Sequence, residues 1–156
     1  MRIAVISASA KQPEWVRSGF ESYARRLRGG LTLELTAVPL PRRSRSAALG
    51  ALIEREGERM LAAVPKGARI VALEESGRQF TTSELAVRLE GWIDRGGPVA
   101  LLIGGPDGLS PACRERADES WSLSALTLPH GMVRIVVAEA IYRAWSLRQG
   151  HPYHRD

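Results

Sequence analysis

An apolar run that ends in a glycine turn is the feature of this sequence that most constrains its fold. The run Val99–Ile103 carries no charge and does not alternate, which is typical of a strand buried on both faces of a parallel sheet. A turn rich in glycine follows at residues 104–108, and Ser110-Pro111 then has the pattern of a helix start. Strand, glycine turn and helix in this order form ligand sites at the carboxyl ends of strands.

The chain before this turn alternates between strand and helix patterns. Strands are predicted at residues 2–6, 31–38 and 70–73, and helices at residues 16–27 and 47–64. A further helix begins at a capping box formed by Thr81 and Glu84 and ends before Gly96. This alternation predicts one α/β domain built on a parallel sheet.

Composition narrows the class of protein. The 156 residues carry a net charge of +5, so nucleic acid is a plausible partner, although arginine-rich composition also follows from a GC-rich genome. The single cysteine, Cys113, excludes an internal disulfide and a cysteine-rich zinc site. No apolar stretch is long enough to span a membrane, and the N-terminal run is too short for a signal peptide. We therefore expect a cytoplasmic enzyme without a membrane partner.

Known phosphate-binding motifs are absent from the glycine turn. Its sequence, GGPDG, is neither the dinucleotide fingerprint G-x-G-x-x-G nor the P-loop G-x-x-x-x-G-K-[ST]. A basic loop at residues 39–46 has a composition that suits phosphate contacts, but a solvated loop explains its spacing better.

The last third of the chain is dense in polar and aromatic residues. The run from Leu123 to Leu128 is predicted as a fifth strand with its terminal loop, and His130 stands at the start of a final helix. That helix has a wide apolar face, including Val137, which suits packing against the sheet and a second subunit. In the tail at residues 150–156, His151 and His154 have no metal-ligand partners at a recognised spacing, so no metal is expected.

These residues carry a resemblance to a known family. The chain resembles the RlmH-type ribosomal RNA large-subunit methyltransferases, which are small SPOUT enzymes. The matching stretches are PEWV at 13–16, EREGERML at 54–61, LLIGGPDGLSP at 101–111, WSLSALTLPH at 121–130, YRAW at 142–145 and HPYHR at 151–155.

The resemblance implies a fold and a cofactor. It implies a single SPOUT domain over residues 1–156, an open parallel sheet flanked by helices, with a C-terminal trefoil knot in a cofactor-binding region at about 99–149 and a tail at 150–156. Knots are rare exceptions to chain topology, so elementary rules do not supply one. The implied cofactor is S-adenosyl-L-methionine, the methyl donor. By position in the motifs, its binding residues are Leu73, Gly104, Leu123, Ser124, Ala125, Leu126, Thr127 and Leu128.

The resemblance also implies a reaction and partners. The family acts as a homodimer and methylates N3 of a pseudouridine in 23S ribosomal RNA within the assembled ribosome. The matching catalytic positions are His130, Arg143, Tyr153 and His154. A cation such as Arg143 stabilises the anion that forms when the N3 proton leaves, and His130 or the tail accepts that proton.

Two other classes of function remain open. The first is a non-catalytic ribosome-binding or assembly factor on the same fold, against which the intact LSALTLPH and HPYHR motifs argue. The second, without the resemblance, is an α/β module that binds a nucleotide or another small molecule, which the missing phosphate-loop motifs disfavour.

Overall fold

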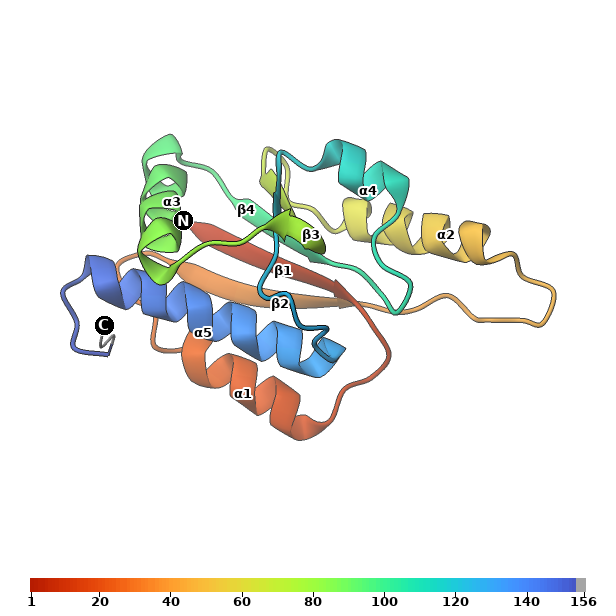
Figure 1. Ribbon diagram of the computed structural model, residues 1–156, viewed down its shortest axis with the longest axis horizontal. Coiled ribbons are helices and arrows are strands. Elements are labelled where there is room, and N and C mark those ends of the chain that lie inside the picture. Colours follow the sequence, from red (N-terminus) through yellow and green to blue (C-terminus); the bar gives the residue numbers. More distant parts are fainter. Residues whose placement is uncertain (154–156) are drawn as a thin grey trace.

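The computed structural model describes residues 1–153 as a five-stranded parallel sheet flanked by helices (Figure 1). The strands are β1 (Arg2–Ala8), β2 (Thr32–Val38), β3 (Arg69–Arg78), β4 (Val99–Ile103) and β5 (Glu119–Trp121), in the order β2-β1-β4-β3-β5. The helices are α1 (Glu14–Ala24), α2 (Leu49–Ala62), α3 (Thr82–Arg95), α4 (Pro111–Arg116) and α5 (His130–Arg148). The predicted α/β class and parallel sheet are thereby confirmed.

The helices form two layers, one on each face of the sheet. Helices α1, α3 and α5 lie on one face, where α5 contacts both α1 and α3, and α2 packs with α4 on the other (Figure 1). Each layer closes over its own apolar cluster. The central strands are therefore buried from both sides, and all five residues of β4 are buried, as its uncharged sequence predicts.

Two predicted helix starts are confirmed in atomic detail. The Thr81 Oγ1 accepts a hydrogen bond from the Glu84 N–H at 3.2 Å, and the Glu84 carboxylate accepts one from the Thr81 N–H at 2.8 Å. At α4, Ser110 is the N-cap and its hydroxyl accepts from the Cys113 N–H at 3.1 Å, with Pro111 at the first helical position. Both caps satisfy N–H groups that a helix cannot pair internally.

Two predicted boundaries are wrong. Strand β3 continues to Arg78 with an irregularity after Leu73, where the sequence predicted a loop from residue 74. The predicted strand at residues 123–128 is an irregular segment, and β5 ends before it at Trp121. Ser124 explains the second error, because its hydroxyl accepts a hydrogen bond from the Leu126 N–H at 3.0 Å and turns the chain.

The apolar face of α5 is directed mostly into the protein. Val137, Ala138 and Ile141 are fully buried in the cluster that α5 shares with the sheet. The apolar face was expected to pack against both the sheet and a second subunit, and Val137 belongs to the part that packs within the chain, so its expected place in a subunit contact is wrong. Among the described residues, no helix is long and apolar enough to cross a membrane.

The capping box gives a first prediction. Substitution Thr81→Ala removes the side-chain acceptor at the start of α3, and we expect it to lower the free energy of unfolding by about 1 kcal/mol. Ser83→Ala is the matched control, because Ser83 lies in the same exposed turn and is not the cap. Urea denaturation monitored by circular dichroism measures both. An equal effect of the two substitutions would show that the cap adds nothing.

Candidate functional site

A cavity lies at the carboxyl ends of β3, β4 and β5. Its volume is about 590 Å³, within the usual range for a small-molecule site. Three segments line it: the irregular part of β3, the glycine turn after β4 and the segment between β5 and α5. The predicted position of the site, after the strand Val99–Ile103, is where the cavity lies.

The glycine turn closes too tightly for side chains at its first two positions. A Cβ at Gly104 would lie 2.6 Å from the backbone nitrogen of Leu109, and a Cβ at Gly105 would collide with the carboxylate of Glu56. Gly108 has φ of +83°, a conformation that other residues rarely adopt. These glycines therefore form a cavity wall made of backbone.

Glu56 on α2 supports this wall from behind, and the sequence analysis missed it. Its side chain is buried, and Oε1 accepts a hydrogen bond from the Gly105 N–H at 2.8 Å. Burial raises the pKa of Glu56, and the Gly105 hydrogen bond partly opposes this shift. The signal was present in the sequence, because Glu56 lies midway between Leu52 and Met60 at spacings of four residues, on the buried stripe of the helix.

The residues predicted to bind a cofactor lie together, with one exception. Seven of the eight line the cavity: Leu73, Gly104, Leu123, Ser124, Leu126, Thr127 and Leu128. Ala125 is exposed and does not line it. The Thr127 hydroxyl donates to the Glu75 carboxylate at 3.0 Å, which joins two of the three lining segments.

His130, the first residue of α5, also lines the cavity. Its Nδ1 atom is the one buried side-chain nitrogen or oxygen in residues 1–153 for which no hydrogen-bond partner is found. An unsatisfied buried polar atom is costly, and it is a frequent feature of functional sites. Within the same residues, no group of three or more His, Cys, Asp or Glu side chains is arranged to hold a metal ion.

Arg143 and Tyr153 lie at the other end of α5. Arg143 follows His130 by 13 residues, a distance of about 20 Å along a helix. The Arg143 Nε donates to Glu139 Oε1 at 2.7 Å, and the Tyr153 hydroxyl donates to the same oxygen at 3.2 Å. One chain therefore does not bring these predicted catalytic residues to His130, and His154 lies outside the described residues.

Tyr153 is held against α5 by aromatic and charged contacts. Its ring meets that of Tyr142 edge-on with centroids 4.7 Å apart, and the Arg143 guanidinium lies 4.9 Å from the centre of the Tyr153 ring. Burial, followed by a hydrogen bond with Tyr23, raises the pKa of Tyr153 to about 12. The hydroxyl is therefore protonated at neutral pH and can donate a hydrogen bond.

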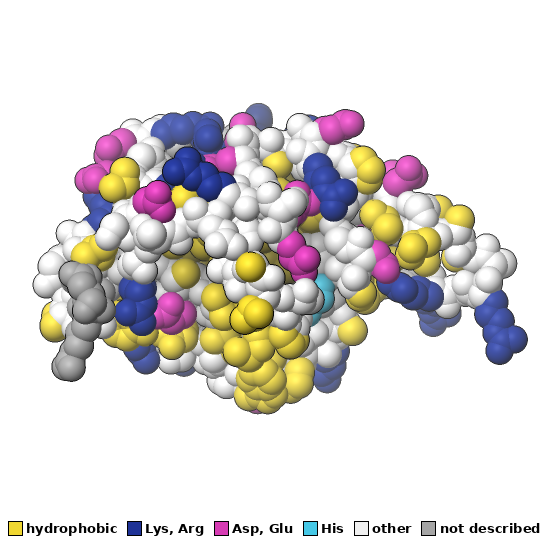
Figure 2. Space-filling model, in the orientation of Figure 1, with side chains coloured by type: hydrophobic (Ala, Val, Ile, Leu, Met, Phe, Trp, Pro, Cys, Tyr) yellow, Lys and Arg dark blue, Asp and Glu magenta, His cyan; other side chains and the backbone are white. Residues whose placement is uncertain are grey.

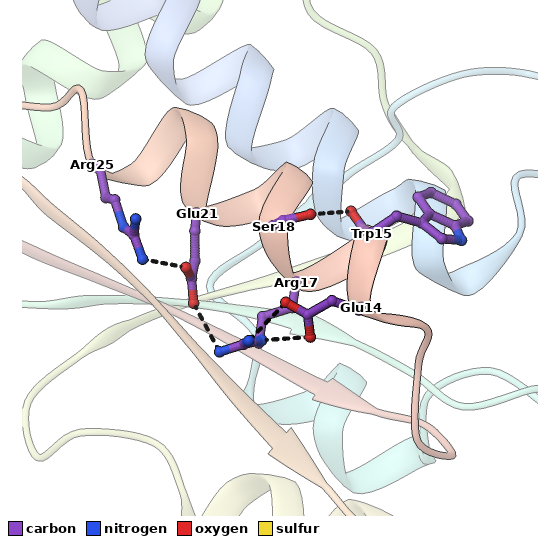
Figure 3. Close-up of polar contacts among 6 residues, drawn as sticks. All are labelled: Glu14, Trp15, Arg17, Ser18, Glu21 and Arg25. Atoms are coloured by element: carbon purple, nitrogen blue, oxygen red, sulfur yellow. Dashed lines mark hydrogen bonds and ion pairs between the residues drawn. The ribbon is translucent and has the colours of Figure 1, made fainter.

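Apolar side chains are exposed near the His130 end of α5. Trp15 is 54% exposed, Leu126 72% and Met132 39%, and Figure 2 shows apolar side chains gathered over α1 on this face. Figure 3 shows the Trp15 indole pointing away from the row of ion pairs that links Glu14, Arg17, Glu21 and Arg25 on α1. We refer to Trp15, Leu126 and Met132 as the apolar rim.

Comparison with solved structures finds methyltransferases of low sequence identity. The SpoU methyltransferase AviRb from Streptomyces viridochromogenes is 20% identical, with 96% of this chain and 60% of that chain covered and a TM-score of 0.45. The structure of the same protein in complex with AdoMet is also 20% identical, with 95% of this chain and 58% of that chain covered and a TM-score of 0.47. Ribosomal RNA small subunit methyltransferase E from Neisseria gonorrhoeae, bound to S-adenosyl methionine, is 12% identical. The match covers 93% of this chain and 67% of that chain, with a TM-score of 0.50. The chain spans about three fifths of the length of the AviRb structures.

Fold and cavity together define an α/β protein with a ligand site at the carboxyl ends of its parallel strands. A family model described as "Predicted SPOUT methyltransferase" matches residues 1–154. The chain belongs to the SPOUT methyltransferase family.

The buried carboxyl of Glu56 gives a second prediction. A raised pKa in the folded state means that folding disfavours the charged form, so stability is lost as pH rises through the folded-state pKa. Glu56→Gln keeps an oxygen that accepts from Gly105 but removes the charge. We therefore expect the variant to have a higher free energy of unfolding than the wild type at pH 8. This difference should vanish below pH 4.5, the ordinary pKa of a glutamate.

Urea denaturation at pH 4 and pH 8 checks this prediction. Glu58→Gln is the control, because Glu58 is exposed on the same helix. A stability difference between Glu56→Gln and the wild type that does not change with pH would contradict the assignment of the shift to Glu56.

Proposed function

We propose that this protein is an S-adenosyl-L-methionine-dependent methyltransferase of the RlmH type. The observation that carries the proposal is the agreement between the cavity lining and the motif positions, since seven of eight expected cofactor residues line one cavity of about 590 Å³. Membership of the SPOUT methyltransferase family supports it, and so do solved structures of related methyltransferases that contain this cofactor.

The cavity fits the chemistry of that cofactor. The glycine wall at Gly104 and Gly105 brings backbone groups close to a ligand, where they can hydrogen-bond an adenine or a ribose. Leu73, Leu123 and Leu128 line the cavity and can enclose a flat base. When bound, the cofactor supplies an activated methyl group on a sulfonium sulfur. No metal is needed for this reaction.

The substrate that we propose is the N3 atom of a pseudouridine in 23S ribosomal RNA within the assembled ribosome. Methyl transfer to N3 requires loss of the N3 proton, and alignment of the nitrogen with the methyl group contributes much of the rate. His130, whose Nδ1 lacks a partner within residues 1–153, is the first candidate to accept that proton. A cation from Arg143 would stabilise the anionic base. The net charge of +5 suits an RNA partner and a cytoplasmic site of action.

A homodimer would bring the two ends of the site together. Arg143 lies about 20 Å along α5 from His130, and Tyr153 packs beside Arg143, so both are too far from His130 to act with it on one substrate atom within a single chain. We propose that the tail at residues 150–156, with Tyr153 and His154, completes the cavity of the neighbouring subunit. The apolar rim of Trp15, Leu126 and Met132 is exposed in the single chain and would form part of the contact.

The domain organisation proposed with this function is one SPOUT domain over residues 1–156. Its cofactor-binding region at about 99–149 contains the trefoil knot, which stays a prediction. The alternative function, a non-catalytic ribosome-binding or assembly factor, would need neither the unpartnered His130 nitrogen nor the glycine wall.

The first experiment measures methyl transfer from labelled S-adenosyl-L-methionine to ribosomes purified from cells that lack this protein. Free ribosomal RNA is assayed beside them. Label in the large-subunit RNA of intact ribosomes is the expected result. Cofactor binding without transfer to either substrate would exclude the proposed target, and loss of cofactor binding would favour the assembly factor.

Subunit mixing gives a third prediction. His130→Ala and Arg143→Ala should each be inactive as homodimers, because each removes one half of every site. After the two variants are unfolded and refolded together, about a quarter of the wild-type rate should return, since half the dimers are mixed and each keeps one intact site. Refolding His130→Ala with the double variant His130→Ala, Arg143→Ala is the control. No recovery in the first mixture would contradict a shared site.

A further inference from the structure

A shallow cationic depression lies on the protein away from the cofactor cavity, at the beginning of β3. Its volume is about 240 Å³, and it is lined by Arg69, Arg88, Gly91, Trp92 and Arg95. Arg69 is the first residue of β3, and the other four belong to α3. Arg88, Gly91 or Trp92, and Arg95 follow one another at spacings of three or four residues, so they share one face of the helix.

The floor of the depression is anchored by one carboxylate. Glu119 at the start of β5 accepts hydrogen bonds from Arg69 Nε at 2.8 Å, from Arg88 and from Trp92 Nε1 at 3.2 Å. The neighbouring carboxylate, Asp118, accepts from the Ile70 N–H at 2.8 Å and is not part of the lining. Three arginines therefore line the depression and no acidic residue does, which leaves positive charge in excess.

The arginines differ in how firmly they are held. Arg88 is fixed on two sides, because it pairs with Glu119 and its guanidinium lies 4.5 Å from the centre of the Phe80 ring. Arg95, in the last turn of α3, is exposed and makes no hydrogen bond or ion pair from its side chain to any residue of the described range 1–153. Its guanidinium is thus available to an external anion.

Gly91 leaves room in the depression between these arginines. Glycine in a helix interior is destabilising relative to alanine, so such a position needs a reason. Packing does not require it here, because a Cβ at Gly91 would meet no atom within 4 Å. The glycine instead leaves the surface between Arg88 and Arg95 open, and any other side chain would project into the depression.

We propose that this depression binds a backbone phosphate of the RNA substrate. The planar guanidinium matches the geometry of phosphate oxygens and can contact two of them at once. Arg69 and the cavity residue Leu73 lie four residues apart on β3, or about 13 Å, so one RNA can contact both sites. The identity of the RNA rests on the proposed function, whereas phosphate binding in the depression does not.

Two variants test the site without removing a contact that holds the fold. Arg95→Glu reverses the charge of a side chain that has no partner in the described range. Gly91→Glu places a carboxylate in the depression, and glutamate favours the helix more than glycine does. Arg55→Glu is the matched control for Arg95→Glu, because it makes the same charge change at an exposed position on α2, on the opposite face of the sheet. All three are compared with the full-length wild type.

Binding of a short fluorescein-labelled RNA is measured by anisotropy over a series of salt concentrations. We expect Arg95→Glu and Gly91→Glu each to weaken binding about tenfold at low salt. We also expect each to reduce the slope of log K against log salt by about one, the loss of one phosphate contact. Arg55→Glu should change neither quantity by as much. Equal effects of all three variants, or an unchanged slope in both depression variants, would overturn the proposal.

Methyl transfer to ribosomes, measured in parallel, separates this proposal from the proposed function. If transfer occurs, both depression variants should raise the KM for ribosomes and leave the affinity for S-adenosyl-L-methionine unchanged. An unchanged KM together with unchanged RNA binding overturns the depression and leaves the enzyme standing. Absence of transfer by the wild type, with RNA binding that is still sensitive to Arg95→Glu, refutes the function and leaves the phosphate site.

Discussion

The hydrogen bond from the Gly105 N–H to the buried Glu56 carboxylate is the contact on which the site depends. It joins α2, on one face of the sheet, to the turn at the end of β4, the strand at the centre of the fold. Because no Cβ fits at Gly104 or Gly105, the turn can close only as bare backbone. The carboxyl group then holds this backbone in place, at the cost of burying a titratable side chain.

The two ends of α5 have different surroundings, and the predicted catalytic residues are divided between them. At the first residue, His130 meets the cavity with a nitrogen that has no partner in the described part of the chain. More than three turns later, Arg143 and Tyr153 share one oxygen of Glu139, and the Tyr153 ring packs between the Arg143 guanidinium and the ring of Tyr142. A rigid helix cannot bend to join its ends, which is why the site that we propose uses a second copy of the chain.

The cofactor cavity and the arginine-lined depression lie at different places on the protein and differ in charge. The cavity is lined by glycines, leucines and polar side chains, and its one arginine, Arg114, is paired with Glu74. The excess positive charge of the lining arginines lies instead at the beginning of β3, around Glu119. Under the proposed function, long-range attraction of an RNA would act at a distance from the methyl-transfer site, and salt should weaken the first without changing the chemistry of the second.

The sequence by itself determined the first four strands, the glycine turn and the caps at Thr81 and Ser110, because these follow from local periodicity and from short patterns that are contiguous in the chain. Most of the cavity lining was predicted instead from the motifs that carry the family resemblance. Only the tertiary structure decided the burial of Val137, the role of Glu56 and the grouping of Arg69 with Arg95, since each depends on which elements become neighbours across the sheet. Local patterns specify elements, whereas contacts between residues far apart in sequence are fixed when the layers pack.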